Sequence, residues 1–509
     1  MRRFFFSLLV ALLTFAPAFS QESPKREFRG AWLHIVGNQQ IKNLTREQIQ
    51  QWFTETLDCL ADQGCNAVIF QVRPQADAFY ASELEPWTRF LTGEQGVAPD
   101  PFWDPLQFMV EECHARGMEL HAWLNPYRVT SNDREQLWPG HLYFRKPEIF
   151  KRYGKQLYFD PGEPEAIAHT VGVIADIVRR YDVDAIHFDD YFYPYPERHE
   201  EFHDDASFAK YAAAQGFEYW QKGDWRRNNV ETLIHAANDT IKAIKPWVRF
   251  GISPFGIHRN KKDAPDGSDT NGLSNYDELF ADVPGWAEKG YIDYIVPQLY
   301  WRIGHPAADY DVLIHWWNDK NYKGHLYIGQ NVSSFSEPDL TNPAVTQTAR
   351  KMSLVRELPN VDGNVWWPGW SLAPQAQPAA SQRPANREKT FSLQDSLKTV
   401  YQKDLALIPA YTDLDSVAPQ RPASVRASGK GISWKPVETD DVMQQPHFYV
   451  VYRFDASETP DVSKIGHIVR ITRDTHYMPA EKRNGKHQYV VTVVDKCWNE
   501  SEPSATVKW

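Results

Sequence analysis

The stretch AIHFDDYF, residues 185–192, shows the unit from which the fold is built. It begins as an apolar run and ends in two adjacent acids, Asp189 and Asp190, which aromatic residues follow at once. Because side chains alternate along a strand, His187 and Asp189 belong to one face and Phe188 to the other. The pattern predicts a buried strand with acids at its carboxyl end. Asp189 points inward, and Asp190 lies at the rim or turns inward after the strand has ended.

Seven other stretches repeat this character, each an apolar strand candidate that turns polar or aromatic at its end. They are FRGAWLHIV (28–36), AVIFQVRP (67–74), ELHAWLNPY (119–127), RFGISPFG (249–256), YIVPQLYW (294–301), HLYIGQNV (325–332) and GNVWWPGW (363–370). Helical patterns follow the eight strands at 45–63, 104–116, 164–181, 228–245, 276–289, 309–319, 344–357 and 390–401. Alternating units of this kind predict an α/β protein with a (β/α)8 TIM barrel. A doubly wound sheet is the alternative, but its Gly-rich phosphate-binding turn is absent from the sequence.

The pattern changes near residue 415, where short alternating strands with turn signals replace the strand–helix repeat. We therefore expect the barrel over residues 27–414 and a small all-β, immunoglobulin-like sandwich over residues 415–509. Trp434, Tyr452 and Tyr489 stand where such sandwiches place core rings. This second domain resembles a fibronectin type III domain, a module whose usual role is spacing or contact.

The amino terminus indicates export. Arg2 and Arg3 precede an apolar stretch that is too short for a good membrane span, and small residues then form a cleavage pattern. We expect a signal peptide over residues 1–20, a short segment over residues 21–26, and no membrane span. The mature protein should then be periplasmic, attached to the cell surface or secreted.

Composition narrows the possible partners. The net charge is −11, and no basic stripe is visible of the kind that a nucleic-acid partner requires. Aromatic residues make up 14% of the chain, and flat rings offer large contact areas to sugars. The four cysteines fit neither a disulfide framework nor a zinc motif, and the histidines are scattered, so we predict no metal and no cofactor. A glycan partner is compatible with this composition, and the oligomeric state stays open.

Acids at a strand end favour glycoside hydrolysis as the chemistry. A (β/α)8 barrel carries its reactive groups at the carboxyl ends of its strands, and glycosidases generally use two carboxylates. Asp189 and Asp190 are the first candidates, but two neighbours can hardly reach both faces of one sugar bond. A second carboxylate is expected from another strand end, and Asp77 is the best candidate. The alternative is that Asp77 only forms a turn.

Other polar and aromatic side chains near the strand ends are candidate substrate-binding residues. They are Arg73, Asn125, Arg128, Tyr191, Gln298, Tyr300, Trp301 and Trp366. The neutral polar groups suit sugar hydroxyls, and the rings suit stacking on sugar faces. The two arginines could bind a substrate carboxylate or tune an acid, with structural ion pairing as the alternative. For the tryptophans, among which Trp123 and Trp367 are further stacking candidates, the alternative is core packing.

The run of motifs is also similar to a known family. FRGAWLHIV, NAVIFQVRPQADAFY, DPLQFMVEECHARGMELHAWLNPYR, AIHFDDYFYPYP, GISPFG and DYIVPQLYW together resemble the glycosyl hydrolase-like family 10 over residues 27 to about 400. The resemblance implies a secreted or surface barrel that cleaves bacterial cell-wall glycan strands stripped of their peptides. The site that it implies is lined by Asp77, Asn125, Arg128, Asp189, Asp190, Gln298 and Tyr300.

Residues and resemblance together predict an exported glycoside hydrolase. The expected substrate is a β-linked N-acetylated glycan, peptide-free peptidoglycan strands in particular, cleaved by carboxylate acid/base catalysis. Two alternatives remain open at this point. The enzyme could hydrolyse another polysaccharide of dietary or host origin, or the barrel could bind glycans without cleaving them. Retention or inversion at the anomeric carbon also stays open, because sequence gives no distance between carboxylates.

Overall fold

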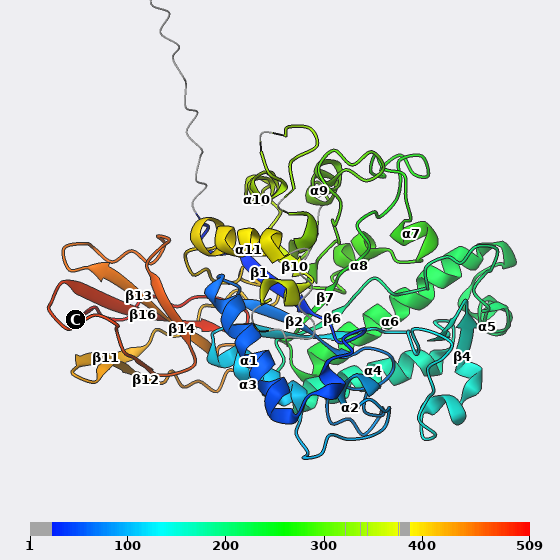
Figure 1. Cartoon of the computed structure of the whole chain (residues 1–509), viewed down its shortest axis with the longest axis horizontal. Helices are drawn as coiled ribbons and strands as arrows, with labels where there is room; N and C mark the ends of the chain where they lie inside the picture. Colours follow the sequence, from blue (N-terminus) through cyan, green and yellow to red (C-terminus); the bar gives the residue numbers. More distant parts are fainter. Residues whose placement is uncertain (1–22, 321, 336, 344, 375, 377–386) are drawn as a thin grey trace, which may run out of the picture.

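The computed structural model describes residues 23–509 apart from 321, 336, 344, 375 and 377–386. Eight parallel strands close into a barrel in the order β1-β10-β9-β8-β7-β6-β3-β2, and antiparallel sheets follow towards the end of the chain (Figure 1). The predicted (β/α)8 fold is therefore confirmed. The predicted signal peptide, residues 1–20, lies outside the described residues. Within them, no helix combines the length and the apolar character needed to cross a membrane.

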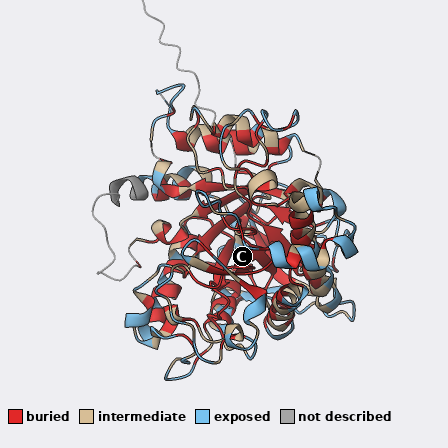
Figure 2. Cartoon of the chain, turned by 90° about the vertical axis from the view of Figure 1, so that its right-hand side faces the viewer, coloured by how far each residue is buried: buried red, intermediate tan, exposed pale blue. Residues whose placement is uncertain are grey.

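Each barrel strand comes from one of the eight predicted regions. The strands are β1 (Phe28–Leu33), β2 (Ala67–Arg73), β3 (Glu119–Leu124), β6 (Ala185–Phe188), β7 (Arg249–Ile252), β8 (Tyr294–Ile295), β9 (His325–Asn331) and β10 (Gly363–Trp367). The helices that follow them are α1 (Arg46–Asp62), α3 (Pro105–Ala115), α4 (Pro164–Arg180), α6 (Lys222–Ile244), α8 (Val283–Lys289), α9 (Tyr310–Asn318), α10 (Gln347–Glu357) and α11 (Arg387–Ser396), the last continuing as a π-helical turn, Leu397–Tyr401. Figure 2 shows the buried strands at the centre and helices with exposed outer faces around them.

Helix starts follow from local sequence chemistry. Thr45 and Gln48 form a reciprocal capping box at the start of α1, which satisfies backbone N–H groups that a first helical turn leaves free. The side chain of Asp104 caps α3 by accepting hydrogen bonds from the backbone N–H groups of Leu106 and Gln107. Pro105 occupies the first helical position, where a backbone N–H would have no partner within the helix. These signals fix where the chain leaves each loop and enters the outer layer of helices.

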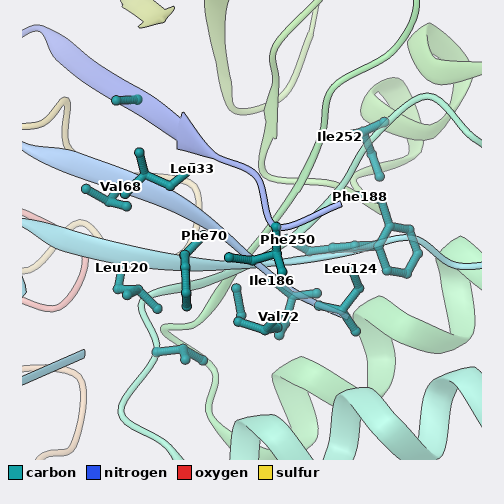
Figure 3. Close-up of a cluster of buried hydrophobic side chains, with 14 of the residues drawn as sticks. Leu33, Val68, Phe70, Val72, Leu120, Leu124, Ile186, Phe188, Phe250 and Ile252 are labelled. Atoms are coloured by element: carbon teal, nitrogen blue, oxygen red, sulfur yellow. The ribbon is translucent and has the colours of Figure 1, made fainter. Parts of the chain in front are cut away.

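Alternation along the strands separates two apolar cores. Side chains on one face of each strand, such as Phe70, Ile186 and Phe188, pack outward against the helices (Figure 3). Side chains on the other face, such as Phe28, Ile69 and Tyr294, fill the barrel. The interior is crowded: a Cβ at Gly251 would lie only 1.9 Å from the ring of Tyr294, so this strand position requires glycine.

Short elements extend the loops at the carboxyl ends of four strands. The segment after β2 contains α2 (Arg89–Thr92), and the segment after β3 contains the hairpin β4 (Phe150–Tyr153) and β5 (Gln156–Phe159). The segment after β6 contains α5 (Asp205–Tyr211), and α7 (Asn275–Glu278) follows β7. These long segments rise at the end of the barrel where (β/α)8 enzymes carry their sites.

Two antiparallel sheets form the carboxyl-terminal part of the chain. One contains β11 (Ala423–Ser428), β12 (Gly431–Lys435) and β15 (His476–Tyr477). The other contains β14 (Ile468–Thr472), β13 (Pro446–Asp455), β16 (His487–Asp495) and β17 (Val507–Lys508). Trp434 and Tyr489 lie in the core between the sheets, as predicted. The prediction for Tyr452 is wrong, because this ring belongs to the apolar cluster that continues into the barrel.

That continuous cluster joins the sheets to the amino-terminal end of the barrel. Phe448 and Trp498 from the sheets share it with interior barrel residues such as Phe28. At its polar margin, the indole N–H of Trp498 donates a hydrogen bond to Glu119, the first residue of β3. Arg249, the first residue of β7, donates a 2.7 Å hydrogen bond to the carbonyl of Lys496. The sheets therefore close one end of the barrel and leave the other end to the site.

Candidate active site

A cavity of about 410 Å³ opens at the carboxyl ends of the barrel strands. Its volume falls within the range of small-molecule sites, ~300–1,000 Å³. The lining residues come from seven of the eight barrel strands or the segments that directly follow them. They are Trp32, His34, Val36, Gln71, Trp123, Arg128, Asp189, Asp190, Tyr191, Ser253, Gln298, Tyr300 and Trp367.

Both acids of the opening motif line this cavity. Strand β6 ends at Phe188, so Asp189 and Asp190 lie in the first residues of the following loop and no longer alternate between two faces. The side chains are 4% and 2% exposed, respectively. Of the two positions predicted for Asp190, the structure has the inward one, and the pair faces the cavity together.

Hydrogen bonding distinguishes the two acids. The hydroxyl of Tyr195 donates a short hydrogen bond to Oδ2 of Asp190. Oδ1 of Asp189 accepts a long bond, 3.4 Å, from the backbone N–H of Tyr191, and Oδ2 makes no hydrogen bond of good geometry among the described residues, although the indole N–H of Trp123 lies close enough to lower the pKa of Asp189. One carboxyl group is thus fixed by a phenol, while the other retains an uncommitted oxygen.

Burial and mutual repulsion hold a proton on the pair. Burial, reinforced by the charge of Asp190, raises the pKa of Asp189 to about 8, and the nearby Arg128 opposes the shift. Burial also raises the pKa of Asp190, against the hydrogen bond from Tyr195. A carboxylic acid that keeps its proton near neutral pH can act as a general acid, and its ionised neighbour can stabilise positive charge.

Arg128 adds a positively charged side chain to the cavity lining that contains the two acids. Its guanidinium lies 4.5 Å from the ring centroid of Tyr191, a cation–π arrangement. The side chain is buried, its Nε has no hydrogen-bond partner among the described residues, its Nη2 donates a long bond, 3.4 Å, to the carbonyl of Pro74, and it also interacts with the Tyr191 hydroxyl. Among the described residues, no carboxylate lies within 4.0 Å of this guanidinium, although its charge acts to lower the pKa of both Asp189 and Asp190. Arg128 therefore keeps donors available for a ligand.

Neutral hydrogen-bonding groups complete the polar part of the cavity. The side-chain amide of Gln298, beyond β8, donates 3.1 Å bonds to the carbonyl and the hydroxyl of Ser253, beyond β7, which fixes its orientation. Tyr300 lines the cavity two residues later. Gln71 accepts hydrogen bonds of 2.8 and 2.9 Å from the backbone N–H groups of Ile35 and Val36 and so holds the loop after β1 against the cavity.

Aromatic rings form the rest of the wall. Trp123 and Trp367 meet edge to face, with ring centroids 6.1 Å apart, and His34 lies 4.8 Å from Trp367. Burial lowers the pKa of His34 to about 4, so its imidazole is neutral at the pH values at which most enzymes work. Acids and a cation beside an aromatic enclosure suit a sugar, which has apolar faces and polar edges.

Several predicted site residues lie outside the cavity. Asp77 is fully buried, accepts a 3.0 Å hydrogen bond from Gln95, and has a pKa raised to about 6 by burial. Arg73 forms a buried ion pair with Glu85, with 2.6 Å between Nη2 and Oε1. The amide of Asn125 donates to the carbonyl of Pro74, 3.0 Å away.

Two predicted stacking residues also face elsewhere. Trp366 is fully buried and packs edge to face on Phe335, because alternation along β10 turns it towards the helices and turns Trp367 inward. Trp301 packs on Phe255 and is absent from the cavity lining. The structure therefore brings together Asp189, Asp190, Arg128, Tyr191, Gln298 and Tyr300 from the predicted set.

Trp32, His34, Val36, Gln71 and Ser253 line the cavity without having been among the candidate site residues. Alternation could have identified two of them: Trp32 follows the inward-facing Phe28 by four positions, and Gln71 follows the inward-facing Ile69 by two. Val36 lies beyond the end of β1, where the strand period no longer applies.

A second cluster of potential metal ligands lies at the opposite end of the barrel. Ligand atoms of Glu119, Asp184 and His447 lie within 4.8 Å of one another. Glu119 is already paired with Arg249, and Asp184 contacts His114 at 2.8 Å. Because protein cations and hydrogen bonds satisfy these carboxylates, the cluster is an internal ion-pair network between barrel and sheets.

A (β/α)8 barrel with paired acids in an aromatic cavity at the strand ends has the design of a glycosyl hydrolase. Similarity to known proteins leads to the same class. Residues 27–346 match the family described as Glycosyl hydrolase-like 10, and the chain belongs to this family of glycosyl hydrolases.

Two curated relatives cover most of the chain. Glycosyl hydrolase YngK of Bacillus subtilis (strain 168) is 38% identical over 99% of this chain and 97% of that protein. Glycosyl hydrolase DigH of Escherichia coli (strain K12) is 37% identical over 72% of this chain and 88% of that protein. Among solved structures, the PgaB (BpsB) glycoside hydrolase domain from Bordetella bronchiseptica is 11% identical with a TM-score of 0.46, covering 73% of this chain and 99% of that one.

Proposed function

We propose that this glycosyl hydrolase cleaves β-linked bonds in an N-acetylated glycan, namely peptidoglycan strands that have lost their peptides. The reaction would take place outside the cytoplasm, because residues 1–20 have the pattern of a signal peptide. The observation that carries the proposal is the pair Asp189 and Asp190, which lies in an aromatic cavity beside Arg128, whose guanidinium has no carboxylate within 4.0 Å among the described residues.

The acids supply the chemistry of bond cleavage. Asp189, with a pKa raised to about 8 by burial and by Asp190, would protonate the leaving sugar oxygen. Asp190, held by the hydroxyl of Tyr195, would face the positive charge that develops on the sugar ring. Trp123 and Trp367 offer faces and edges against which sugar rings can pack.

Arg128 favours peptidoglycan over a neutral glycan. A buried arginine whose guanidinium has no carboxylate within 4.0 Å among the described residues favours an anionic ligand. Peptidoglycan strands freed of peptides carry a lactyl carboxylate on every second sugar. Such a carboxylate would take up the donors that Arg128 leaves free, whereas a neutral polysaccharide would leave them unpaired.

The test is incubation of the full chain with peptide-free strands, followed by measurement of new reducing ends. Asp189→Asn and Asp190→Asn are each expected to lose at least about a hundredfold in rate. The matched control is Asp239→Asn, an exposed acid on α6, which should cleave at the wild-type rate. Strands that stay intact with the wild-type chain, or full activity in both active-site variants, would refute the proposal.

A further inference from the structure

Among the described residues, the lining of the cavity offers no carboxylate from a second strand end, where a two-carboxylate glycosidase needs one. Asp189 and Asp190 are the carboxylic acids among its lining residues, and they are neighbours in one loop. Retaining and inverting enzymes usually flank the scissile bond with carboxyl groups ~5–5.5 Å or ~6.5–9.5 Å apart, approaching from different sides of the sugar. Asp77, the candidate partner from another strand, does not line the cavity and is bonded to Gln95. Both acids of the cavity therefore come from the same loop after β6.

Other side chains in the lining do not replace the missing nucleophile. Burial raises the pKa of the Tyr300 phenol well above its usual value and that of Tyr191 to about 12, so neither is activated as a phenolate. The hydroxyl of Ser253 accepts the amide N–H of Gln298, and among the described residues no basic side chain accepts its proton, so it is not activated as a nucleophile. The nucleophile must then come from water or from the substrate itself.

We propose that the nucleophile is the substrate's own 2-acetamido oxygen, so that the sugar on the non-reducing side of the cleaved bond must be N-acetylated. This inference rests on the proposed function and states which group of the glycan takes part in the reaction. Asp190 holds the acetamido N–H, and Asp189 donates the proton. Both groups act from the same side of the site, which is what adjacent residues can do.

The arrangement fits each part of an acetamido group. Asp190 is anchored by the hydroxyl of Tyr195, so its carboxylate is oriented to accept one N–H. The apolar methyl group needs an apolar wall, which the perpendicular rings of Trp123 and Trp367 provide. Oδ2 of Asp189 makes no hydrogen bond of good geometry among the described residues and is free to serve the glycosidic oxygen. An isolated buried carboxylate would be costly, whereas one bonded to an N–H is not.

The reaction balances in two displacements at the anomeric carbon, C1. First, the acetamido oxygen attacks C1 while the bond from C1 to the leaving sugar breaks, and the leaving oxygen takes the proton of Asp189. The product is an oxazolinium ion whose N–H is bonded to the Asp190 carboxylate. Water then attacks C1, its proton passes to the Asp189 carboxylate, and the bond between C1 and the acetamido oxygen breaks. Two inversions give net retention of configuration, and the acetamido group is restored.

The experiment measures binding of a transition-state mimic separately from turnover. The probe is the thiazoline made from chitobiose, a stable analogue of the oxazolinium ion, titrated into the full chain by calorimetry. We expect binding by the wild-type chain and at least tenfold weaker binding by Asp190→Asn, with Asp239→Asn as the unchanged control. In parallel, peptide-free strands and the same strands after chemical N-deacetylation are assayed for reducing ends, and NMR reports the anomer formed first.

The outcomes separate this inference from the proposed function. Cleavage of intact strands with retention, a loss of at least a hundredfold on deacetylated strands, and Asp190-dependent thiazoline binding support the inference. Cleavage with inversion, or equal rates on both kinds of strand, overturns the inference and leaves the proposed function standing. Thiazoline binding that depends on Asp190, without cleavage of peptidoglycan strands, supports the acetamido site and refutes the proposed substrate. Absence of thiazoline binding overturns the inference whichever strand is cleaved.

Discussion

The indole nitrogen of Trp32 donates a 3.2 Å hydrogen bond to Nε2 of His187 inside the barrel. Nδ1 of His187 lies 3.0 Å from the hydroxyl of Tyr294, which lies 2.8 Å from Nδ1 of His121. Nε2 of His121 in turn contacts Glu119 at 2.8 Å. Because burial lowers the pKa of His187, its imidazole is neutral, so Nε2 accepts from Trp32 and Nδ1 donates to Tyr294. One directional column of hydrogen bonds thus runs from a cavity wall to the sheets.

Replacing His187 tests this column. His187→Phe removes the acceptor of the buried Trp32 N–H, so we expect a loss of ~1–3 kcal/mol in the free energy of unfolding. We also expect KM to rise more than kcat falls, because Trp32 is a cavity wall and donates no proton to the reaction. Urea unfolding and steady-state kinetics measure these effects, with the exposed His203→Phe as the matched control. Unchanged stability and KM would show that the column does not position Trp32.

The raised pKa of Asp189 predicts the alkaline limb of the pH profile. A general acid is active only while protonated, so kcat/KM should fall by about tenfold per pH unit once the pH exceeds about 8. Glycan strands assayed between pH 5 and pH 10 give this limb. Its persistence in Asp189→Asn, measured on a substrate with an activated leaving group, would assign the proton donor to another residue, with Asp190 the first candidate.

The raised pKa of Asp189 also predicts that this residue lowers the free energy of unfolding of the wild-type protein as the pH rises. An unfolded aspartate has a pKa of ~3.9, whereas folded Asp189 has a pKa of about 8. Between these values the folded state binds more protons than the unfolded state, so the free energy of unfolding falls as the pH rises. Asp189→Asn escapes this loss and should be more stable than wild type at pH 8, by up to ~5 kcal/mol, with the difference closing near pH 4. Urea unfolding at both pH values measures it. A variant less stable than wild type at pH 8 would contradict the burial argument.

Arg128 should distinguish charged from neutral glycans. Arg128→Gln removes a charge-assisted contact worth ~1.5–3 kcal/mol, which corresponds to at least about a tenfold loss of kcat/KM on peptidoglycan strands. Chitin oligosaccharides lack the carboxylate, so their cleavage should change less. The ratio of the two rates is the measurement, and Arg128→Lys, which keeps the charge but not the fork of donors, should lie between the two. Equal losses on both substrates would mean that Arg128 acts only on the acids.

Replacing Asp77 tests the conclusion that this residue is not catalytic. Since Asp77 lies outside the cavity and bonds to Gln95, Asp77→Asn should keep kcat within about tenfold of wild type, whereas the loss for Asp189→Asn should be far larger. Reducing-end assays of both variants decide between them, and thermal unfolding separates folding defects from catalytic ones. A loss as large as that of Asp189→Asn, in a stably folded variant, would return Asp77 to the catalytic residues.

Periodicity was sufficient for the fold but only partly for the site. Eight strand–helix units were visible in the chain, and alternation placed Ile186 and Phe188 against the helices, where the structure has them. The same rule applied to β10 would have chosen Trp367 over Trp366 as a cavity residue. Alternation alone would turn Asp190 away from the cavity. Because β6 ends at Phe188, directly before the acids, the loop turns both of them inward.

Sequence by itself determined the barrel, the acids at the end of its fourth strand, and the family, because these depend on local period and on motifs contiguous in the chain. Tertiary structure alone decided which of two arginines is ion-paired and which lines the cavity. Arg73 is neutralised by Glu85, whereas Arg128 lies over Tyr191 at the cavity wall. It also decided that Asp77 is bonded to Gln95 away from the acids. Such choices depend on contacts between loops far apart in the sequence, and no local pattern encodes those contacts.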